Sequence, residues 1–484
     1  MIARREVRPA LRRHLVPILA VTAVAVAVRS TWVGFVHARP VSDYLFYYRS
    51  AAALASGHGY SILGHPTAFF PVGYPAFLAA LFAVFGTRLG VVWVSGVVLW
   101  TVAAVLAYLL GVELHGRAVG VIAGLLVALA PDFVVFTGLA ASESLFVPLL
   151  AIACLLLGLT PAARLGWRRA AAIGVLLGLA ILVRSTAVLL PFVFGAGVVL
   201  LVRSRRSLLV AGVLLAATGL VLAPWIVRNR LVMGTATIST NGGYTLWMGL
   251  NPRATGGSTV RGVLPPWPIA TVHSEVSQDA AYQRQAVHWA LSHPGRALAL
   301  VPRKLRFLLA WRDGPAVANF ERPAGTDPFR YRAPRPLTAA EARIERAAAF
   351  EPVQSLLHDV FLIVGAAGIV LGVARRRPVA GWIATVTLFW IVFNATLIHG
   401  QTRFLTSVSP LLAPGVGLLA VTLVSLVASR LTGRVGQATQ PATGPASPGG
   451  PPRLVSTGDE PRERSPEEET PHAPEPRPGR KEAA

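Results

Sequence analysis

The chain has 484 residues, of which 54% are hydrophobic and only 14% are charged, a balance too apolar for a soluble enzyme of this length. The formal net charge of +23 does not favour nucleic-acid binding, because the arginines stand at the ends of apolar runs and not on one soluble domain. The composition therefore predicts an all-α protein that crosses a membrane many times. The single cysteine, Cys154, lies inside an apolar run and excludes an internal disulfide.

Apolar segments along the chain predict about ten transmembrane helices, each with a length suited to a bilayer. Short basic loops follow every second segment, which predicts that both chain ends are cytoplasmic in a multi-pass protein of the cell membrane. The stretch 170–202 is short for two crossings and requires two short helices or a re-entrant pair. The predicted spans are residues 15–35, 91–111, 118–131, 144–160, 170–184, 186–202, 207–227, 357–374, 379–398 and 405–428.

The segments outside these spans divide the chain further. A basic cytoplasmic N-terminus, 1–14, precedes the membrane domain, 15–428. Two outer loops interrupt that domain. The first, 37–90, contains two segments that predict short helices at the membrane surface, Asp43–Ser56 and Pro75–Phe85. The second, 228–355, is large enough for an ordered subdomain. The tail 429–484 is rich in Pro, Gly, Ser and Glu, and this composition predicts disorder.

Carboxylates at predicted span ends are the first candidates for a site, because an ionised group near lipid needs a partner or a function. Asp43, Asp132, Glu143 and Asp359 all fall at outer ends. Each also has a structural interpretation: Asp43 and Glu143 follow serines and suit helix N-termini, where a carboxylate caps free amides or complements the helix dipole. For Asp359 the structural interpretation is favoured.

Two arginines stand at the same outer edge, where short loops are normally poor in arginine. Arg184 lies in LVRST, at the turn of the short helix pair, and Arg403 lies in QTRFL. A planar guanidinium matches phosphate oxygens and stays charged near lipid, so both predict an anion site. The alternative is that they extend toward lipid headgroups.

The sequence resembles the polyprenyl-phosphate-dependent glycosyltransferases of the C-type (GT-C) fold, in the branch of protein O-mannosyltransferases and the lipid A aminoarabinose transferase. The likeness extends over most of residues 10–428. It rests on SDYLFYYRSAAALASGHGY around Asp43, PTAFFPVGYPAFLAALFAVFG, ASESLF around Glu143, LVRST, NGGYTLWMGLNPRATGG from Asn241, and QTRFLTSVSPLL.

This resemblance implies a membrane bundle with a large extracytoplasmic loop, and transfer of a monosaccharide from a polyprenyl-phosphate donor to an outer acceptor (protein, lipid or glycan) with inversion. Asp43 takes the role of general base and Glu143 assists it. The donor phosphate is assigned to Arg403, Arg184 and Lys304. Residues expected to line the substrate site are Tyr47, Tyr74, Asp132, Asn241, His399 and Gln401.

The resemblance leaves metal dependence open, since some C-type enzymes use a divalent ion and others do not. The candidate ligands for such an ion are the carboxylates of Asp43, Asp132 and Glu143, which form an oxygen-rich set, and the histidines His58 and His65. The sequence departs from the family in two places. Tyr44 follows Asp43, where protein mannosyltransferases carry Glu, and the stretch 65–74 has neither the acid nor the lysine of the aminoarabinose transferase. The sugar and the acceptor therefore stay open.

Two other functions compete with transfer. A transporter or flippase of lipid-linked sugars also needs many spans and phosphate-binding arginines, but it predicts midplane charges and an inverted repeat, neither of which is clear in the sequence. A non-catalytic assembly scaffold is the third hypothesis.

Overall fold

The computed structural model describes residues 3–38, 40, 42–257, 272–310 and 351–438. The chain divides into two compact units, Met1–Ser429 and Arg430–Ala484. The architecture below is that of the first unit. Of the tail 429–484 that was predicted to be disordered, residues 429–438 are helical, and residues 439–484 lie outside the described residues. The parts 258–271 and 311–350 of the large outer loop also lie outside them.

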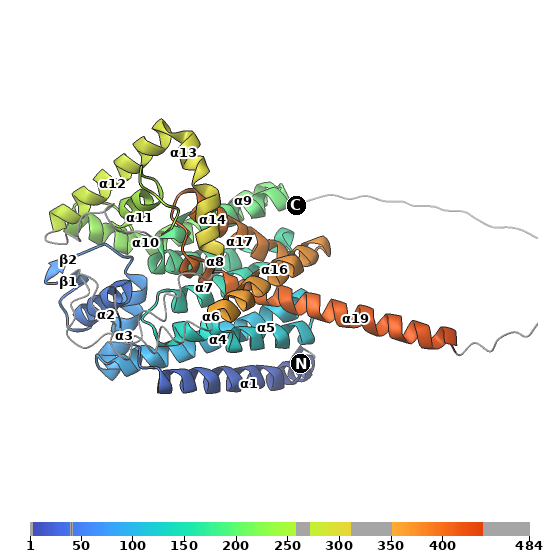
Figure 1. Ribbon diagram of the computed structural model, residues 1–484. Coiled ribbons are helices and arrows are strands. Elements are labelled where there is room, and N and C mark those ends of the chain that lie inside the picture. The colour runs from blue at the N-terminus through green and yellow to red at the C-terminus, as the bar shows by residue number, and fades with distance from the viewer. Residues whose placement is uncertain (1–2, 39, 41, 258–271, 311–350, 439–484) are drawn as a thin grey trace, which may run out of the picture. The chain divides into compact units, whose positions relative to one another are not determined.

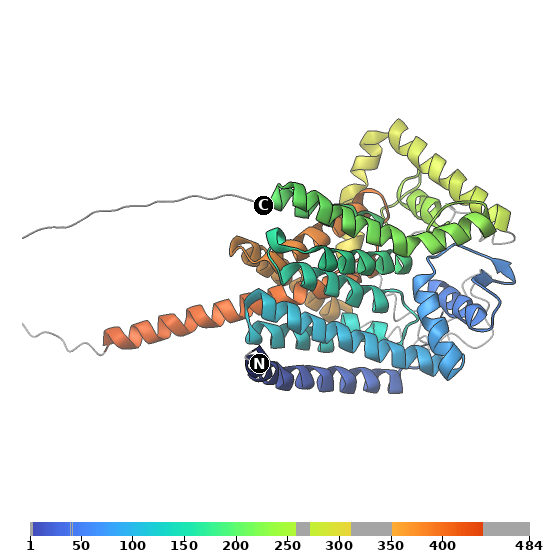
Figure 2. The same cartoon turned by 180° about the vertical axis from the view of Figure 1, so that it is seen from behind.

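The first unit is a bundle of long apolar helices, seen from two sides in Figures 1 and 2. Every predicted span falls largely on helical structure. The bundle helices are α1 (Ala3–Phe35), α4 (Leu89–His115), α5 (Arg117–Leu129), α7 (Glu143–Gly158), α8 (Trp167–Val183), α9 (Leu190–Val202), α10 (Arg205–Met233), α16 (Glu351–Ala374), α17 (Pro378–Thr396) and α19 (Ala413–Ala438).

Length and composition allow seven membrane-crossing helices among the described residues, or eight if a bent pair counts as one span. The expectation of about ten was higher because α7 and α8, with 16 and 17 residues, are shorter than a typical span. The seven are Arg13–Phe35, Leu89–His115, Ser185–Val202, Arg205–Met233, Val353–Ala374, Pro378–Thr396 and Ser409–Arg430. The chain is therefore a multi-pass membrane protein.

The bent pair brings the chain to the start of α7. After α5 the chain turns by 58° into α6 (Pro131–Val134) and η1 (Val135–Gly138), where Pro131 cannot continue the hydrogen bonds of α5. Arg29 of α1 is fully buried beside the bend and donates to the carbonyl oxygens of Val127 (2.6 Å) and Phe133 (3.2 Å) and to Thr137 Oγ1 (3.0 Å). These bonds satisfy carbonyls that the bend releases.

The short stretch 170–202 forms two helices, as predicted. Between α8 and α9 the chain passes through an extended Arg184 (φ −143°, ψ 107°) and the 3-10 turn η3 (Ser185–Leu189). Gly174 allows α8 to approach α10 closely, since a Cβ there would lie 2.3 Å from a carbonyl oxygen of α10. The helix that leads into this turn is thus packed closely on α10.

The predicted last span, 405–428, needs correction because it is not one continuous helix. The chain forms the short helix α18 (Thr402–Thr406), then the 3-10 turn η6 (Ser409–Leu412), and only then α19. Pro410 has no N–H to donate, which breaks the helix at this point. Farther along, a Cβ on Gly368 of α16 would lie 1.9 Å from the carbonyl oxygen of Gly415 in α19, so these helices meet through small residues.

The first outer loop contains the two helices that the sequence predicts, α2 (Ser42–Ala55) and α3 (Gly73–Phe85). It also contains a small antiparallel hairpin that the sequence analysis missed, β1 (Ser61–Ile62) and β2 (His65–Pro66). Leu63 and Gly64 make its turn with φ of 51° and 81°. Figures 1 and 2 show these blue elements at the end of α1 away from the N-terminus.

The described part of the second outer loop forms α11 (Gly242–Gly249), α12 (Val272–Ser292), α13 (Pro294–Ala299) and α14 (Val301–Leu309). These helices have a small apolar core of their own, made by Leu250, Ala286, Trp289 and Leu300. Glu275 of α12 joins them to the first loop: it is buried and accepts hydrogen bonds from Thr67 Oγ1 (2.7 Å), the Ala68 amide (2.9 Å) and Thr240 Oγ1. The two outer loops therefore pack as one layer.

Candidate active site

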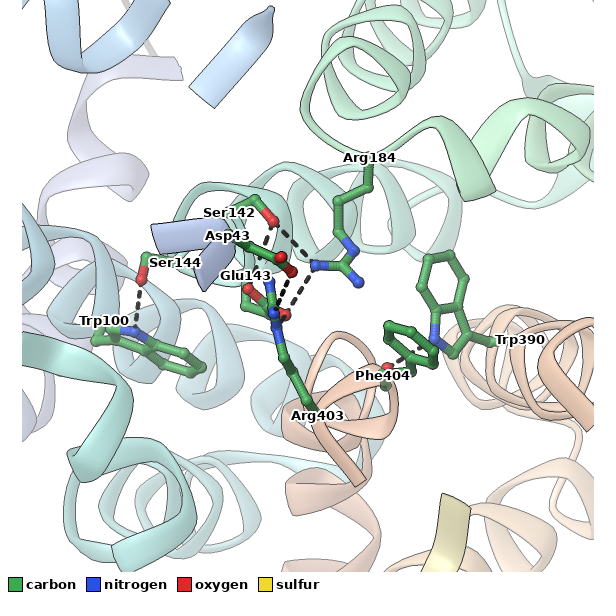
Figure 3. Close-up of polar contacts among 9 residues, drawn as sticks. All are labelled: Asp43, Trp100, Ser142, Glu143, Ser144, Arg184, Trp390, Arg403 and Phe404. Carbon is green, nitrogen blue, oxygen red and sulfur yellow. Dashed lines mark hydrogen bonds and ion pairs between the residues drawn. The ribbon is translucent and has the colours of Figure 1, made fainter. Parts of the chain in front are cut away.

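Four of the predicted site residues form one ion-pair network, shown in Figure 3. Arg403 donates from Nη1 to Asp43 Oδ2 and from Nε to Glu143 Oε1, both at 2.7 Å. Arg184 Nη1 lies 2.8 Å from the same Glu143 oxygen and donates to Ser142 Oγ at 2.9 Å. The order along the network is Asp43, Arg403, Glu143, Arg184. Residues far apart in sequence thus meet at one point.

The two acids occupy helix N-termini, as their sequence context predicts. Asp43 lies in the first turn of α2, where Ser42 Oγ donates to its Oδ1 at 3.3 Å. Glu143 is the first residue of α7, directly after Ser142. A carboxylate in the first turn complements the positive end of the helix dipole. These positions agree with the structural interpretation of the two acids, and their functional interpretation stays a prediction.

Two tryptophans fix the helices that carry the network. Trp100 of α4 donates from Nε1 to Ser144 Oγ at 3.0 Å, beside Glu143 in α7. Trp390 of α17 donates from Nε1 to the carbonyl oxygen of Phe404 at 2.7 Å, next to Arg403 in α18. Both indoles are fully buried and appear on either side of the network in Figure 3. Such supporting contacts restrict movement of the charged side chains.

Burial makes the electrostatics of the network strong. Glu143 is fully buried, and the side chains of Arg184 and Arg403 are each 9% exposed. Burial alone would lower the pKa of Arg403, but the charges of Glu143 and Asp43 raise it well above its ordinary value. The guanidinium of Arg403 also lies over the Tyr44 ring, 4.8 Å from its centroid. Two cations and two anions leave the network without net charge.

A cavity of about 730 Å³ opens beside the network. Its polar wall includes Asp43, Arg184 and Arg403, and its apolar wall includes Phe393 and Leu397 of the α17 end. Arg184 Nε is buried and has no hydrogen-bond partner among the described residues. The cavity thus combines two guanidinium groups with an apolar surface.

Most of the predicted site residues line this cavity. Those on its wall are Asp43, Arg184, Arg403, Tyr47, Asn241, His399 and Gln401. Glu143 does not line the cavity and lies behind the two arginines, so it is not placed for direct contact with a substrate. That Glu143 assists Asp43 therefore stays a prediction, and its contacts in the structure are with the two arginines.

Three other predicted residues also lie off the cavity wall. Tyr74 is buried and packs on Tyr47, with ring centroids 5.6 Å apart. Lys304 is buried as well and donates from Nζ to the carbonyl oxygen of Thr396 at 2.9 Å. Their placement corrects the expectation that Tyr74 lines the substrate site and that Lys304 holds the donor phosphate directly.

Asp132 belongs to a different pair. Its Oδ2 lies 2.5 Å from His358 Nδ1, and His358 Nε2 lies 3.2 Å from the carbonyl oxygen of Leu309. Asp132 therefore links α6 to α16 and does not line the cavity. This pair was not predicted from the sequence, because 226 positions separate Asp132 from His358.

The expected metal ligand set is corrected too. Asp132 is engaged by His358, and Arg403 stands between Asp43 and Glu143. Within the described ranges, no three His, Cys, Asp or Glu side chains gather as metal ligands, and this includes His58 and His65.

The sequence analysis missed a row of polar residues on α12. Glu275, Asp279 and Gln283 follow each other at intervals of four, which places them on one helix face. Asp279 accepts from the Gly243 amide at 2.6 Å and lines the cavity with Gln283. Burial raises the pKa of Asp279 above its ordinary value. The four-residue spacing was a usable signal, hidden among the many charges of this loop.

Comparisons with known proteins agree with this architecture. Residues 69–227 match the family model described as dolichyl-phosphate-mannose-protein mannosyltransferase. No curated protein matches the sequence. The crystal structure of the Archaeoglobus fulgidus oligosaccharyltransferase, in complex with Zn and sulfate, is similar over 88% of this chain, with 14% sequence identity and a TM-score of 0.50. The chain covers 51% of that protein, or about half of its length.

The crystal structure of ArnT from Cupriavidus metallidurans bound to undecaprenyl phosphate is also similar to this chain, with 13% sequence identity and a TM-score of 0.48. The similarity covers 88% of this chain and 66% of ArnT. The fold of the chain is that of the polytopic membrane proteins of the oligosaccharyltransferase type. Together with the family match, this confirms the resemblance to the GT-C branch that includes the protein mannosyltransferases.

Proposed function

We propose that the chain transfers a monosaccharide from a polyprenyl-phosphate donor to an extracytoplasmic acceptor with inversion. The observation that carries this proposal is the cavity in which a partly exposed carboxylate, Asp43, stands beside two buried arginines, Arg184 and Arg403. A base and a cationic phosphate site within one cavity are the two groups that such a transfer needs.

The arginines suit the donor phosphate. Arg184 Nε lacks a partner, and a guanidinium presents several N–H groups in a plane that matches phosphate oxygens. Because the unliganded network is already neutral, an added phosphate competes with Asp43 for Arg403. Asp43 has a side chain that is 28% exposed and is the member free to turn toward the acceptor. Donor binding would thus release the base.

In the chemical step, Asp43 takes the proton of the acceptor hydroxyl or amide as that group attacks the anomeric carbon. The bond from this carbon to the phosphate oxygen breaks, and its electron pair stays on the phosphate. Arg184 and Arg403 stabilise the charge on the leaving group, so no acid is required to protonate it. Attack from the side opposite the phosphate inverts the configuration. Glu143 positions both arginines and does not contact the substrate.

The lipid part of the donor suits the apolar wall. Val188, Phe393 and Leu397 line the cavity, and Leu397 is 41% exposed. A polyprenyl chain placed along these residues would remain in the membrane lipid while its phosphate reaches the arginines. We assign the cavity to the extracytoplasmic side, and both chain ends to the cytoplasm, from the distribution of basic loops.

The experiment is reconstitution in liposomes with radiolabelled polyprenyl phosphosugars that carry different sugars. Wild-type protein is compared with Asp43→Asn and with the control Asp359→Asn, which changes an exposed carboxylate outside the cavity. We expect release of polyprenyl phosphate and labelled product from wild type and control, and neither from Asp43→Asn. Movement of intact donor across the bilayer without release of sugar would contradict the proposal and support the flippase alternative.

A further inference from the structure

One wall of the cavity carries uncharged hydrogen-bonding groups and a histidine with one unpaired ring nitrogen. His399 lines the cavity, is only 4% exposed, and its Nδ1 has no hydrogen-bond partner among the described residues. Asn241, Thr245 and Gln401 line the same cavity. Because an unpaired buried polar atom costs free energy, a bound ligand group that pairs with Nδ1 would be favoured.

The backbone around His399 is held in place by close contacts. A Cβ on Gly249 of α11 would lie 2.1 Å from the carbonyl oxygen of Ile398, and the Gly400 amide donates to the Gly256 carbonyl at 2.7 Å. The imidazole also packs edge-on against Phe404, with ring centroids 5.0 Å apart. The ring is therefore a fixed feature of the cavity wall.

The same aromatic ring relates His399 to the proposed phosphate site. The guanidinium of Arg184 lies 5.9 Å from the centroid of Phe404. His399 and Arg184 thus pack on the same phenyl ring, and both residues line the cavity, so a ligand that fills the cavity adjoins both. In a phosphosugar, the group next to the phosphate is the sugar ring.

The charge state of His399 selects the kind of ligand. Burial lowers the pKa of His399 to about 4, and the positive charge of Lys304 lowers it further. Hydrogen bonds with Gln401 and Thr245 raise the pKa but do not offset these two effects. The imidazole is therefore neutral at physiological pH and has one donor and one acceptor nitrogen. Neutral imidazole, amide and hydroxyl groups match sugar hydroxyls better than they match an anion.

We propose that His399, together with Asn241 and Gln401, binds hydroxyl groups of the sugar ring of the lipid-linked donor. This inference rests on the proposed function, because it assigns the sugar end of the same substrate. It makes His399 a recognition residue that distinguishes the glycosylated lipid from the bare lipid phosphate. The arginines, in contrast, bind the phosphate that both lipids share.

Binding measurements separate these two contributions without requiring turnover. Purified protein in detergent is titrated with undecaprenyl phosphate and with undecaprenyl phosphate mannose. The variants are His399→Leu, the conservative His399→Asn, which retains a polar atom near the position of Nδ1, and Arg184→Met. His293→Leu is the control, since His293 is exposed and does not line the cavity.

We expect His399→Leu to weaken binding of the mannose-bearing lipid by about tenfold, the order of one or two lost hydrogen bonds, with binding of bare undecaprenyl phosphate unchanged. His399→Asn should recover part of this loss, and Arg184→Met should weaken both lipids. Equal effects of His399→Leu on both lipids, or none on either, would overturn the inference. Wild-type protein that prefers the mannose-bearing lipid but transfers no sugar would contradict the proposed function and support the sugar subsite.

Discussion

Replacement of Glu143 by Gln tests how strongly the buried network holds the fold. Glu143 is fully buried and pairs with Arg184 at 2.8 Å and Arg403 at 2.7 Å. Glutamine keeps the shape but removes the charge, which leaves two buried guanidinium groups with Asp43 as the remaining anion of the network. Loss of one partner from a buried pair typically costs about 3–5 kcal/mol. We expect the free energy of unfolding to fall by about this amount.

The assay is unfolding of the purified protein in mixed micelles by added dodecyl sulfate, followed by tryptophan fluorescence. Glu113→Gln, which changes a carboxylate of α4 outside the network, serves as the control. The double variant Glu143→Gln with Arg184→Met should be more stable than Glu143→Gln alone, because one cation and one anion again balance. A single Glu143→Gln variant within about 1 kcal/mol of wild type, the scale of an exposed ion pair, would refute this reasoning.

Three further predictions concern the surroundings of the site. Burial lowers the pKa of Lys304 from 10.5 to about 8. Between these two pH values the unfolded chain binds more protons than the folded chain, so the free energy of unfolding should rise with pH. The variant Lys304→Met should abolish this rise in the micelle assay. Gly368→Ala should destabilise the fold by about 1–3 kcal/mol through a clash with the backbone of α19, whereas Gly381→Ala, with open space around it, should have little effect. Glu275→Gln should increase hydrogen exchange in residues 61–68, because its carboxylate holds Thr67 and Ala68; unchanged exchange would show that this contact does not stabilise the hairpin.

The charged residues of the site were predictable because charge is rare at the ends of apolar segments. Asp43, Glu143, Arg184 and Arg403 stood out for this reason, and the structure joins them in one network. Their order in the network was not predictable, because a local sequence pattern does not show that Arg403 separates the two acids.

Other features depended on contacts that sequence does not encode locally. The partner of Asp132 is His358, 226 positions away, and a linear census of charges cannot pair them. The break before α19 had a local signal in Pro410, which cannot donate a backbone hydrogen bond, but the prediction treated 405–428 as one span. Polar residues such as Asp279 lay in a loop with many charges, where rarity gives no signal.

The most direct test of the central claim is the single-turnover rate of sugar release at saturating donor, compared between wild type and Asp43→Asn. If Asp43 is the general base, the variant should bind the donor but release sugar about 10²–10⁴ times more slowly. A variant that binds the donor and releases sugar at the wild-type rate would contradict the account.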